Sequence, residues 1–171
     1  CFSEYNHNVA QVLLTRDIIE DENRKNNVTN TLSRLLSLSV IPVINENDTV
    51  ATEEIEFGDN DTLSAIVAAI VQADLLMILT DIDGLYDSDP HLNPKAKKIP
   101  VVTMIDDAVL AVGGNKGSEF GTGGMAAKLH AAQLCMEEKI PMIIMNGNRP
   151  SRIYGLLDGE DIGTLFYAGR T

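Results

Sequence analysis

Cysteine, aromatic residues and positive charge are scarce in this sequence of 171 residues. It has two cysteines, no tryptophan, and 13 lysines and arginines against 25 aspartates and glutamates, which gives a formal net charge of -12. Because an acidic surface repels nucleic acid and anionic membranes, we expect neither as a partner. Two cysteines do not indicate a disulfide framework or a zinc site, so the expected compartment is the reducing cytoplasm.

Long apolar runs are also absent. No stretch approaches the roughly 20 apolar residues that are needed to cross a bilayer, and no signal peptide opens the sequence. Hydrophobic residues still make up 44% of the sequence, which predicts one domain with a proper core at this length. Because the first residue is Cys1 rather than methionine, we expect the sequence to be part of a longer chain.

The glycine-rich stretch Gly121-Thr-Gly-Gly-Met-Ala-Ala-Lys128 carries the clearest chemical signal. Its glycines allow successive N–H groups to point into one concavity, and the run 125–138 that follows is predicted to be a helix. A helix N-terminus favours an anion, because unpaired N–H groups and the helix dipole place positive charge there. A lysine in the first turns of a helix is unfavourable for the helix alone, and a bound phosphate would explain Lys128.

Two standard phosphate motifs fit this stretch poorly. A P-loop has glycine directly before its lysine, whereas Lys128 follows Ala127. The dinucleotide motif requires a strand before the glycines, and residues 115–120 do not form a strand pattern. A glycine-rich surface linker with a solvated lysine stays open as the alternative. Because an acidic protein that handles phosphate needs cations, we expect Mg²⁺, with its ligands unknown.

Strand and helix patterns alternate along the chain. We expect strands at 9–14, 40–44, 75–79, 142–145 and 163–167. We expect helices at 29–38, 62–71, 105–112, 125–138 and 152–157, with 17–27 an exposed helix or loop and 49–57 a hairpin or flap. This alternation predicts an α/β fold, with a mainly parallel sheet sandwiched by helices in three αβα layers.

Three details of these elements are predicted from local chemistry. Thr15 and Asp17 are natural caps for a helix that follows the first strand, and Asp106 is one for the helix at 105–112. The continuous apolar run 75–79 is typical of a central parallel strand that is covered on both faces.

Polar side chains cluster where predicted elements meet. Asn45–Asp48 and Thr80–Asp81 each follow a strand, and Asp59–Asp61 opens a helix. Capping explains any one of the last three residues, but three exceed what one cap requires, so we expect at least one of them to face a ligand. Because ligands bind at the carboxyl edge of an α/β sheet, these clusters and the 121–128 loop are predicted to meet at one edge.

Four motifs together resemble the amino acid kinase family, and within it the kinases that act on the γ-carboxylate of L-glutamate. They are Pro42-Val-Ile-Asn-Glu-Asn-Asp48, Gly58-Asp-Asn-Asp-Thr-Leu-Ser-Ala65, Leu79-Thr-Asp81 with Gly84-Leu-Tyr86 and Asp89-Pro90, and Gly121-Thr-Gly-Gly-Met125 with Lys128. The resemblance runs in order from Val9 to the end of the sequence. It implies ATP-dependent phosphorylation of L-glutamate to glutamyl 5-phosphate, the first step of proline biosynthesis, with ATP and Mg²⁺ as cofactors.

The resemblance also implies roles for single residues. Lys128 resembles the lysine that stabilises the transferring phosphoryl group, and Asp81 resembles the aspartate that positions the catalytic lysines. The residues implied to hold the amino-acid substrate are Asp48 and Asn60, with Asp59 and Asp61 beside them. Those implied to bind the nucleotide are Thr80, Asp81, Thr122, Gly123, Gly124, Met125, Ala126, Ala127 and Lys128.

The same resemblance implies a division of the chain. Residues 1–171 would form a single kinase-type domain without its N-terminal portion, with 1–74 in the amino-acid substrate lobe and 75–171 as the nucleotide-binding lobe. Family members carry a second catalytic lysine in an N-terminal loop, and nothing before Val9 matches it. We therefore hypothesise that this chain alone is inactive. We also expect a homo-oligomer, although the sequence does not indicate which surface would form it.

Two other functions stay open. One is phosphorylation of aspartate, acetylglutamate, carbamate or a nucleoside monophosphate by another member of the family. A nucleotide acceptor would require basic residues near 45–61, and that region is acidic. The other is a non-catalytic module that binds an amino acid and a nucleotide as signals.

Overall fold

The computed structural model describes residues 2–15, 18–19, 21–47, 59–90, 92–113 and 123–169. The chain divides into two compact units, Cys1–Gln72 and Ala73–Thr171. Asp48, the predicted hairpin 49–57, Gly121 and Thr122 lie outside the described residues. Among the residues that are described, no helix is long and apolar enough to cross a membrane.

The first unit places two helices against one face of a two-stranded sheet. Its elements are η1 (Phe2–Tyr5), β1 (Asn8–Leu14), α1 (Glu22–Ser37), β2 (Val40–Glu46) and α2 (Asn60–Val71). β1 and β2 pair in parallel, from Asn8 opposite Val40 to Leu14 opposite Glu46. Because side chains alternate along a strand, one sheet face packs with Leu63 of α2 and Val28 of α1.

Helix α1 differs from its prediction. It is one continuous helix that joins the second half of the polar stretch, from Glu22, to the leucine-rich stretch, and its N-cap is Asp21 rather than Thr15. The Asp21 carboxylate accepts hydrogen bonds from the backbone N–H groups of Asn23 (2.8 Å) and Arg24 (3.2 Å). The polar residues just after Glu22 are helical and face solvent. They have no apolar stripe, so the hydrophobic pattern did not show that this stretch is a helix. Asp17, the other predicted cap, lies outside the described residues.

The second unit is built on a four-stranded mixed sheet. Its elements are β3 (Leu76–Thr80), β4 (Val101–Val102), α3 (Asp107–Val112), α4 (Gly123–Glu137), β5 (Met142–Asn146), α5 (Arg152–Leu157) and β6 (Thr164–Phe166). The strand order is β3-β5-β6-β4. β3 pairs with β5, and β4 with β6, in parallel, whereas β5 and β6 are antiparallel.

The prediction that 75–79 is a central strand is wrong for this sheet. β3 lies at one end of the strand order, and Leu79 is 45% exposed. The inner strands are β5 and β6, and in β5 Met142, Ile144 and Met145 are fully buried. Both runs are apolar throughout, so composition alone did not distinguish the edge strand from the inner strand.

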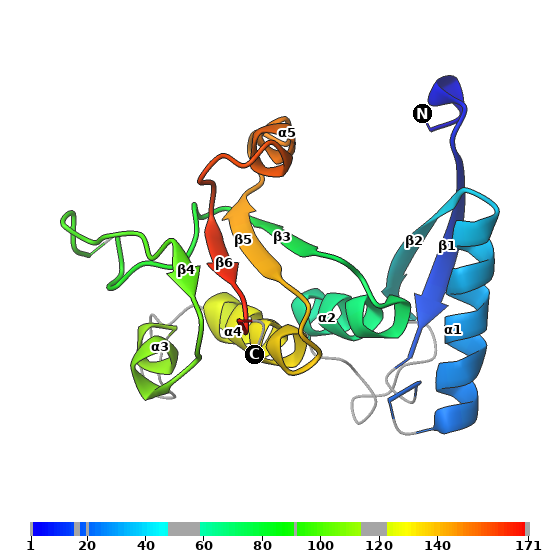
Figure 1. Cartoon of the computed structure of the whole chain (residues 1–171), viewed down its shortest axis with the longest axis horizontal. Helices are drawn as coiled ribbons and strands as arrows, with labels where there is room; N and C mark the ends of the chain where they lie inside the picture. The colour runs from blue at the N-terminus through cyan, green and yellow to red at the C-terminus, as the bar shows by residue number, and fades with distance from the viewer. Residues whose placement is uncertain are drawn as a thin grey trace. The chain divides into compact units, whose positions relative to one another are not determined.

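The core of the second unit has helices on both sides of β5. Ile143 and Met145 pack with Ile153 and Leu156 of α5. Because side chains alternate along a strand, the side chain of Ile144 points to the opposite face. Helix α4 also contacts β5. Figure 1 shows α4 alongside this sheet and α5 beyond the end of β5.

The predicted α/β class is confirmed, with three of the four strand pairs parallel. The described strands form two sheets rather than the single sheet that was predicted. α5 matches its prediction residue for residue, α3 begins after the predicted cap Asp106, and β2 is two residues longer than predicted. Strand β4 was not predicted, because two residues are too short for a periodic pattern.

Candidate functional site

The carboxyl ends of β3 and β5 meet at one edge of the second sheet. Thr80 and Asn146, the last residues of the two strands, are register partners. The pairing continues one residue further, because the backbone N–H of Gly147 donates to the carbonyl of Thr80 at 2.7 Å. A side chain at position 147 would be crowded, since an added Cβ would lie 3.1 Å from Cβ of Leu79. Glycine therefore permits this close approach of the backbone after β5 to the end of β3.

Asp81 is held at this edge through both its backbone and its side chain. The Asn146 side-chain amide donates to the carbonyl of Asp81 at 3.1 Å. The Thr80 hydroxyl donates to Oδ1 of the Asp81 carboxylate at 3.0 Å. Within the described residues, the second carboxylate oxygen of Asp81 accepts no hydrogen bond. Asp81 therefore presents one carboxylate oxygen toward solvent at the end of the strand, where α/β proteins bind ligands.

Helix α4 brings the second set of predicted nucleotide-binding residues. It begins at Gly123, so Gly123 and Gly124 form the first helical turn rather than a loop, and it ends at Glu137. The N–H groups of a first helical turn have no intrahelical partner. The Lys128 ammonium lies 3.4 Å from the carbonyl of Gly124, which places the charged end of this side chain back toward the helix N-terminus. Backbone N–H groups and a cationic side chain thus lie together at the start of α4, which fits a phosphate ligand.

The first unit carries the predicted substrate residues at the start of α2. Asp59 is the N-cap: its carboxylate accepts from the Thr62 N–H at 2.6 Å and from the Thr62 hydroxyl at 3.1 Å. Both carboxylate oxygens of Asp59 are therefore used by Thr62. Asn60 and Asp61 occupy the first turn of α2, where Asn60 is exposed and Asp61 is half-buried. Capping accounts for Asp59, and it leaves Asn60 as the residue of this cluster that faces solvent most openly.

Residues 81–100 form an excursion that begins directly at Asp81 and returns to the sheet. The backbone bonds Ile99 N–H to Leu85 carbonyl (2.8 Å) and Asp87 N–H to Lys97 carbonyl (2.9 Å) close it. Its base is tied to the sheet by Thr164, which is fully buried on β6. The Thr164 hydroxyl accepts from the Leu85 N–H at 2.8 Å and donates to the carbonyl of Ile99 at 2.6 Å. Both ends of the excursion are therefore anchored.

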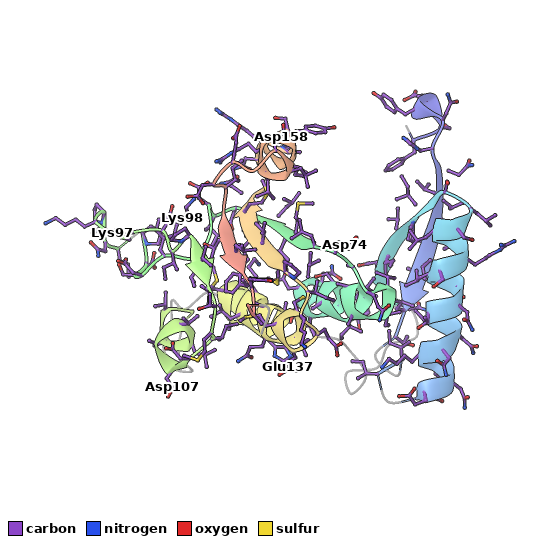
Figure 2. All side chains as sticks on the ribbon, viewed as in Figure 1. Asp74, Lys97, Lys98, Asp107, Glu137 and Asp158 are labelled. Carbon is purple, nitrogen blue, oxygen red and sulfur yellow. The ribbon has the colours of Figure 1, made fainter. Side chains whose placement is uncertain are left out.

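Among the described residues of the second unit, the other chemically reactive groups do not form a site. Burial raises the pKa of the Cys135 thiol to about 11, so it stays protonated and unreactive at neutral pH. The charged side chains Asp107, Glu137 and Asp158 are exposed and lie toward the outside of this unit in Figure 2. The described residues contain no cluster of three His, Cys, Asp or Glu side chains that could hold a metal ion.

The predicted site residues are thus partly brought together. Thr80 and Asp81 lie side by side, and Gly123–Lys128 form the start of α4, all in the second unit. The residues Asn60, Asp59 and Asp61 lie together in the first unit, whereas Asp48 and Thr122 are outside the described residues. Sequence reasoning missed Asn146, because the predicted strand 142–145 ended one residue before it. The signal for it was its place after an apolar strand, the same signal that located Thr80.

The model of the amino acid kinase family matches residues 1–146. This chain belongs to that family. The glutamate 5-kinase of Enterococcus faecalis is 51% identical over 172 residues, which cover 98% of this chain and 64% of the relative. The glutamate 5-kinases of Clostridium perfringens and Symbiobacterium thermophilum are 51% and 54% identical and cover 98% and 96% of this chain. The chain spans 63–64% of the length of these three relatives.

Solved structures of the amino acid kinase fold superpose on most of the chain. The isopentenyl phosphate kinase of T. acidophilum has a TM-score of 0.64 and 20% identity, and it covers 96% of this chain and 62% of its own. The UMP kinase of Ureaplasma parvum has a TM-score of 0.61 and 18% identity, over 96% of this chain and 62% of its own. At this level of identity, the two structures support the fold and not a substrate.

Proposed function

We propose that the protein transfers a phosphoryl group from ATP to the γ-carboxylate of L-glutamate, forming glutamyl 5-phosphate for proline biosynthesis. The observation that carries this proposal is the identity of 51–54% to relatives named glutamate 5-kinase. This identity extends over 96–98% of the chain, including the edge at Asp81 and the start of α4. Because the chain spans 63–64% of those relatives, the activity is proposed for the protein as a whole.

In this proposal, the second unit binds the nucleotide. Thr80 and Asp81 contribute from the strand edge, and residues 122–128 contribute backbone N–H groups at the start of α4. Lys128 would stabilise the charge on the transferring phosphoryl group. Asp81 would orient the catalytic lysines through the carboxylate oxygen that has no partner among the described residues. Phosphoryl transfer needs mainly positioning and charge neutralisation, which these groups supply.

The first unit would bind L-glutamate. Carboxylates and amides are suitable partners for the ammonium group of an amino acid, and Asp48, Asn60 and Asp61 carry them. Asp59 would act mainly by capping α2, since Thr62 occupies both of its carboxylate oxygens. No general base is required, because the γ-carboxylate of the substrate is already ionised at neutral pH.

We also propose that Mg²⁺ accompanies the nucleotide. Mg²⁺ is usually held by one or two carboxylates together with substrate phosphates rather than by a protein cage. Bound Mg²⁺ would neutralise phosphate charge near a chain of net charge -12. We further propose a cytoplasmic homo-oligomer that binds neither nucleic acid nor membranes.

The test measures acyl phosphate as glutamyl hydroxamate, with ATP, Mg²⁺, L-glutamate and hydroxylamine. It uses this chain and also the completed protein, which is this chain joined to the part of the E. faecalis relative that it does not match. We expect the completed protein to form hydroxamate and the chain alone to bind nucleotide without turnover. Lys128→Ala should lower the rate on the order of 100-fold or more, because it removes a charge from the transition state.

The matched control is Lys95→Ala, which removes one exposed cation from the same unit and should leave the rate unchanged. Hydroxamate formation with aspartate instead of glutamate would assign another acceptor. Nucleotide binding with no hydroxamate, even in the completed protein, would favour a non-catalytic module. Equal rates for Lys128→Ala and the parent would remove Lys128 from the mechanism.

A further inference from the structure

At the edge formed by β3 and β5, backbone carbonyl oxygens would disfavour the phosphates of a nucleotide. The carboxyl ends of parallel strands present carbonyl oxygens, whose partial negative charge repels phosphate. Here the two outermost carbonyls of the β3 end, those of Thr80 and Asp81, are both occupied. The Thr80 carbonyl accepts from the Gly147 N–H, and the Asp81 carbonyl accepts from the Asn146 side-chain amide. The end of β5 therefore masks the negative ends of the neighbouring peptide groups.

The Asn146 side chain is fixed at both of its polar atoms. Its Nδ2 donates to the Asp81 carbonyl at 3.1 Å, and its Oδ1 accepts from the Asn148 N–H at 2.8 Å. One partner is an obligatory acceptor and the other an obligatory donor, so only one orientation of the amide satisfies both. The side chain cannot rotate without breaking two hydrogen bonds.

Asp81 is consequently clamped at two points. Asn146 holds its carbonyl from the neighbouring strand, and Thr80 holds Oδ1 of its carboxylate from the same strand. The first contact fixes the peptide plane after β3, and the second fixes the side-chain rotamer. Together they determine where the other carboxylate oxygen of Asp81 points.

We propose that Asn146 is a positioning residue for phosphoryl transfer and acts through Asp81. It fixes the orientation of the Asp81 carboxylate, which would orient the catalytic lysines, and it occupies the Asp81 carbonyl, so that this oxygen repels the phosphates less. This inference rests on the function proposed above. It assigns a role in the reaction to the last residue of β5. Asn146 is only half-buried, so packing in the core does not by itself require an asparagine at this position.

The variant Asn146→Asp tests this role in the completed protein. It keeps the size of the side chain and the acceptor for Asn148, but it places a carboxylate oxygen against the Asp81 carbonyl. We expect kcat to fall roughly 10- to 100-fold, because the Asp81 carboxylate is misplaced, while KM for glutamate changes less than about twofold. As the pH is lowered toward the pKa of the new carboxyl, a growing share of it carries a proton and hence a donor, so the activity of the variant relative to the parent should rise.

The matched control is Asn148→Asp, which adds the same charge two residues away, where only the backbone N–H makes a hydrogen bond. It should keep the parental kcat and show no relative gain at low pH. Equal kcat values for the two variants would overturn the proposal, as would a loss in Asn146→Asp confined to thermal stability. Asn146→Ser, which is smaller and uncharged, repeats the kcat comparison if Asn146→Asp does not fold.

A second measurement separates this inference from the proposed function. Carbon NMR of the chain alone reports the carbonyl of Asp81, whose shift should change in Asn146→Asp and not in Asn148→Asp. If the completed protein forms no hydroxamate, the proposed function fails and the positioning role fails with it, even where this shift confirms the hydrogen bond. If hydroxamate forms and the shift changes but kcat does not, only the positioning role fails.

Discussion

Asp87 shows how a single hydrogen bond makes the excursion after Asp81 sensitive to acid. Its carboxylate Oδ1 accepts from the Lys97 N–H at 2.9 Å, across the neck of the excursion. This backbone hydrogen bond is the largest cause that lowers the pKa of Asp87 below its ordinary value of 3.8. The hydrogen bond from the Ser88 side chain and the positive charge of Lys97 lower it further. The ionised form is therefore favoured in the folded state, and the bond is fully present above that ordinary value.

We predict that the contribution of Asp87 to stability is lost as the pH falls below 3.8 and through the lowered pKa of the folded state. Carbon NMR of the Asp87 carboxyl should give a titration midpoint below 3.8 in the folded chain. Asp87→Asn should lack this part of the acid dependence, because an amide oxygen accepts the same hydrogen bond at every pH. A midpoint at or above 3.8 would contradict the assignment.

At the residue scale, the sequence was informative where chemistry is local. Asp59 was predicted to be a possible cap, and its cap hydrogen bond spans three residues. Asn146 was not among the predicted site residues, because its partner Asp81 lies 65 residues away in the sequence. Such a contact depends on the register between two strands, and side-chain patterns along one strand do not determine register.

At the scale of elements, Thr164 ties the 81–100 excursion to strand β6. Its hydroxyl is the partner of the buried Leu85 N–H and of the Ile99 carbonyl. Leaving a buried donor without a partner costs about 1–3 kcal/mol, because the group has lost its hydration. Valine has the shape of threonine and lacks the hydroxyl, so it isolates this effect.

We predict that Thr164→Val lowers the free energy of unfolding by roughly 1–3 kcal/mol in urea denaturation. Thr164→Ser retains the hydroxyl and loses only a methyl group, so it should cost clearly less. The test is which of the two variants loses more free energy of unfolding. If serine is as destabilising as valine, the methyl group and not the hydroxyl anchors the excursion.

Elements were predicted well where their limits are set by nearby residues. α3 follows its cap Asp106, and α5 matches its predicted range. α4 begins at Gly123 although glycines are poor helix formers. The helix is stabilised by burial of later residues such as Leu129 and Ala132, which local helix propensity does not report. β3 was assigned to the centre of a sheet, since strand order is a property of tertiary structure that an apolar run does not carry.

At the scale of the whole molecule, the chain combines a strongly acidic composition with an apolar sheet face. One face of the β1–β2 sheet packs against helices, whereas the alternate residues Val9, Leu13, Ile41 and Val43 are 40–48% exposed. They share one face because Val9 and Ile41 are register partners and the others lie at alternate positions. Parallel sheets are normally covered on both faces, so this exposure is unusual.

We predict that the purified chain binds the dye ANS at this face and self-associates as salt screens its net charge of -12. Val43→Lys should weaken both effects at least about twofold, because it places a charge at the middle of the patch. The control Leu92→Lys adds the same charge at an apolar residue that is 79% exposed in the second unit. A single exposed leucine is ordinary and offers no contiguous patch, so this control should change little beyond the shift in net charge. Equal effects of the two lysines would show that net charge, and not the sheet face, governs dye binding and association.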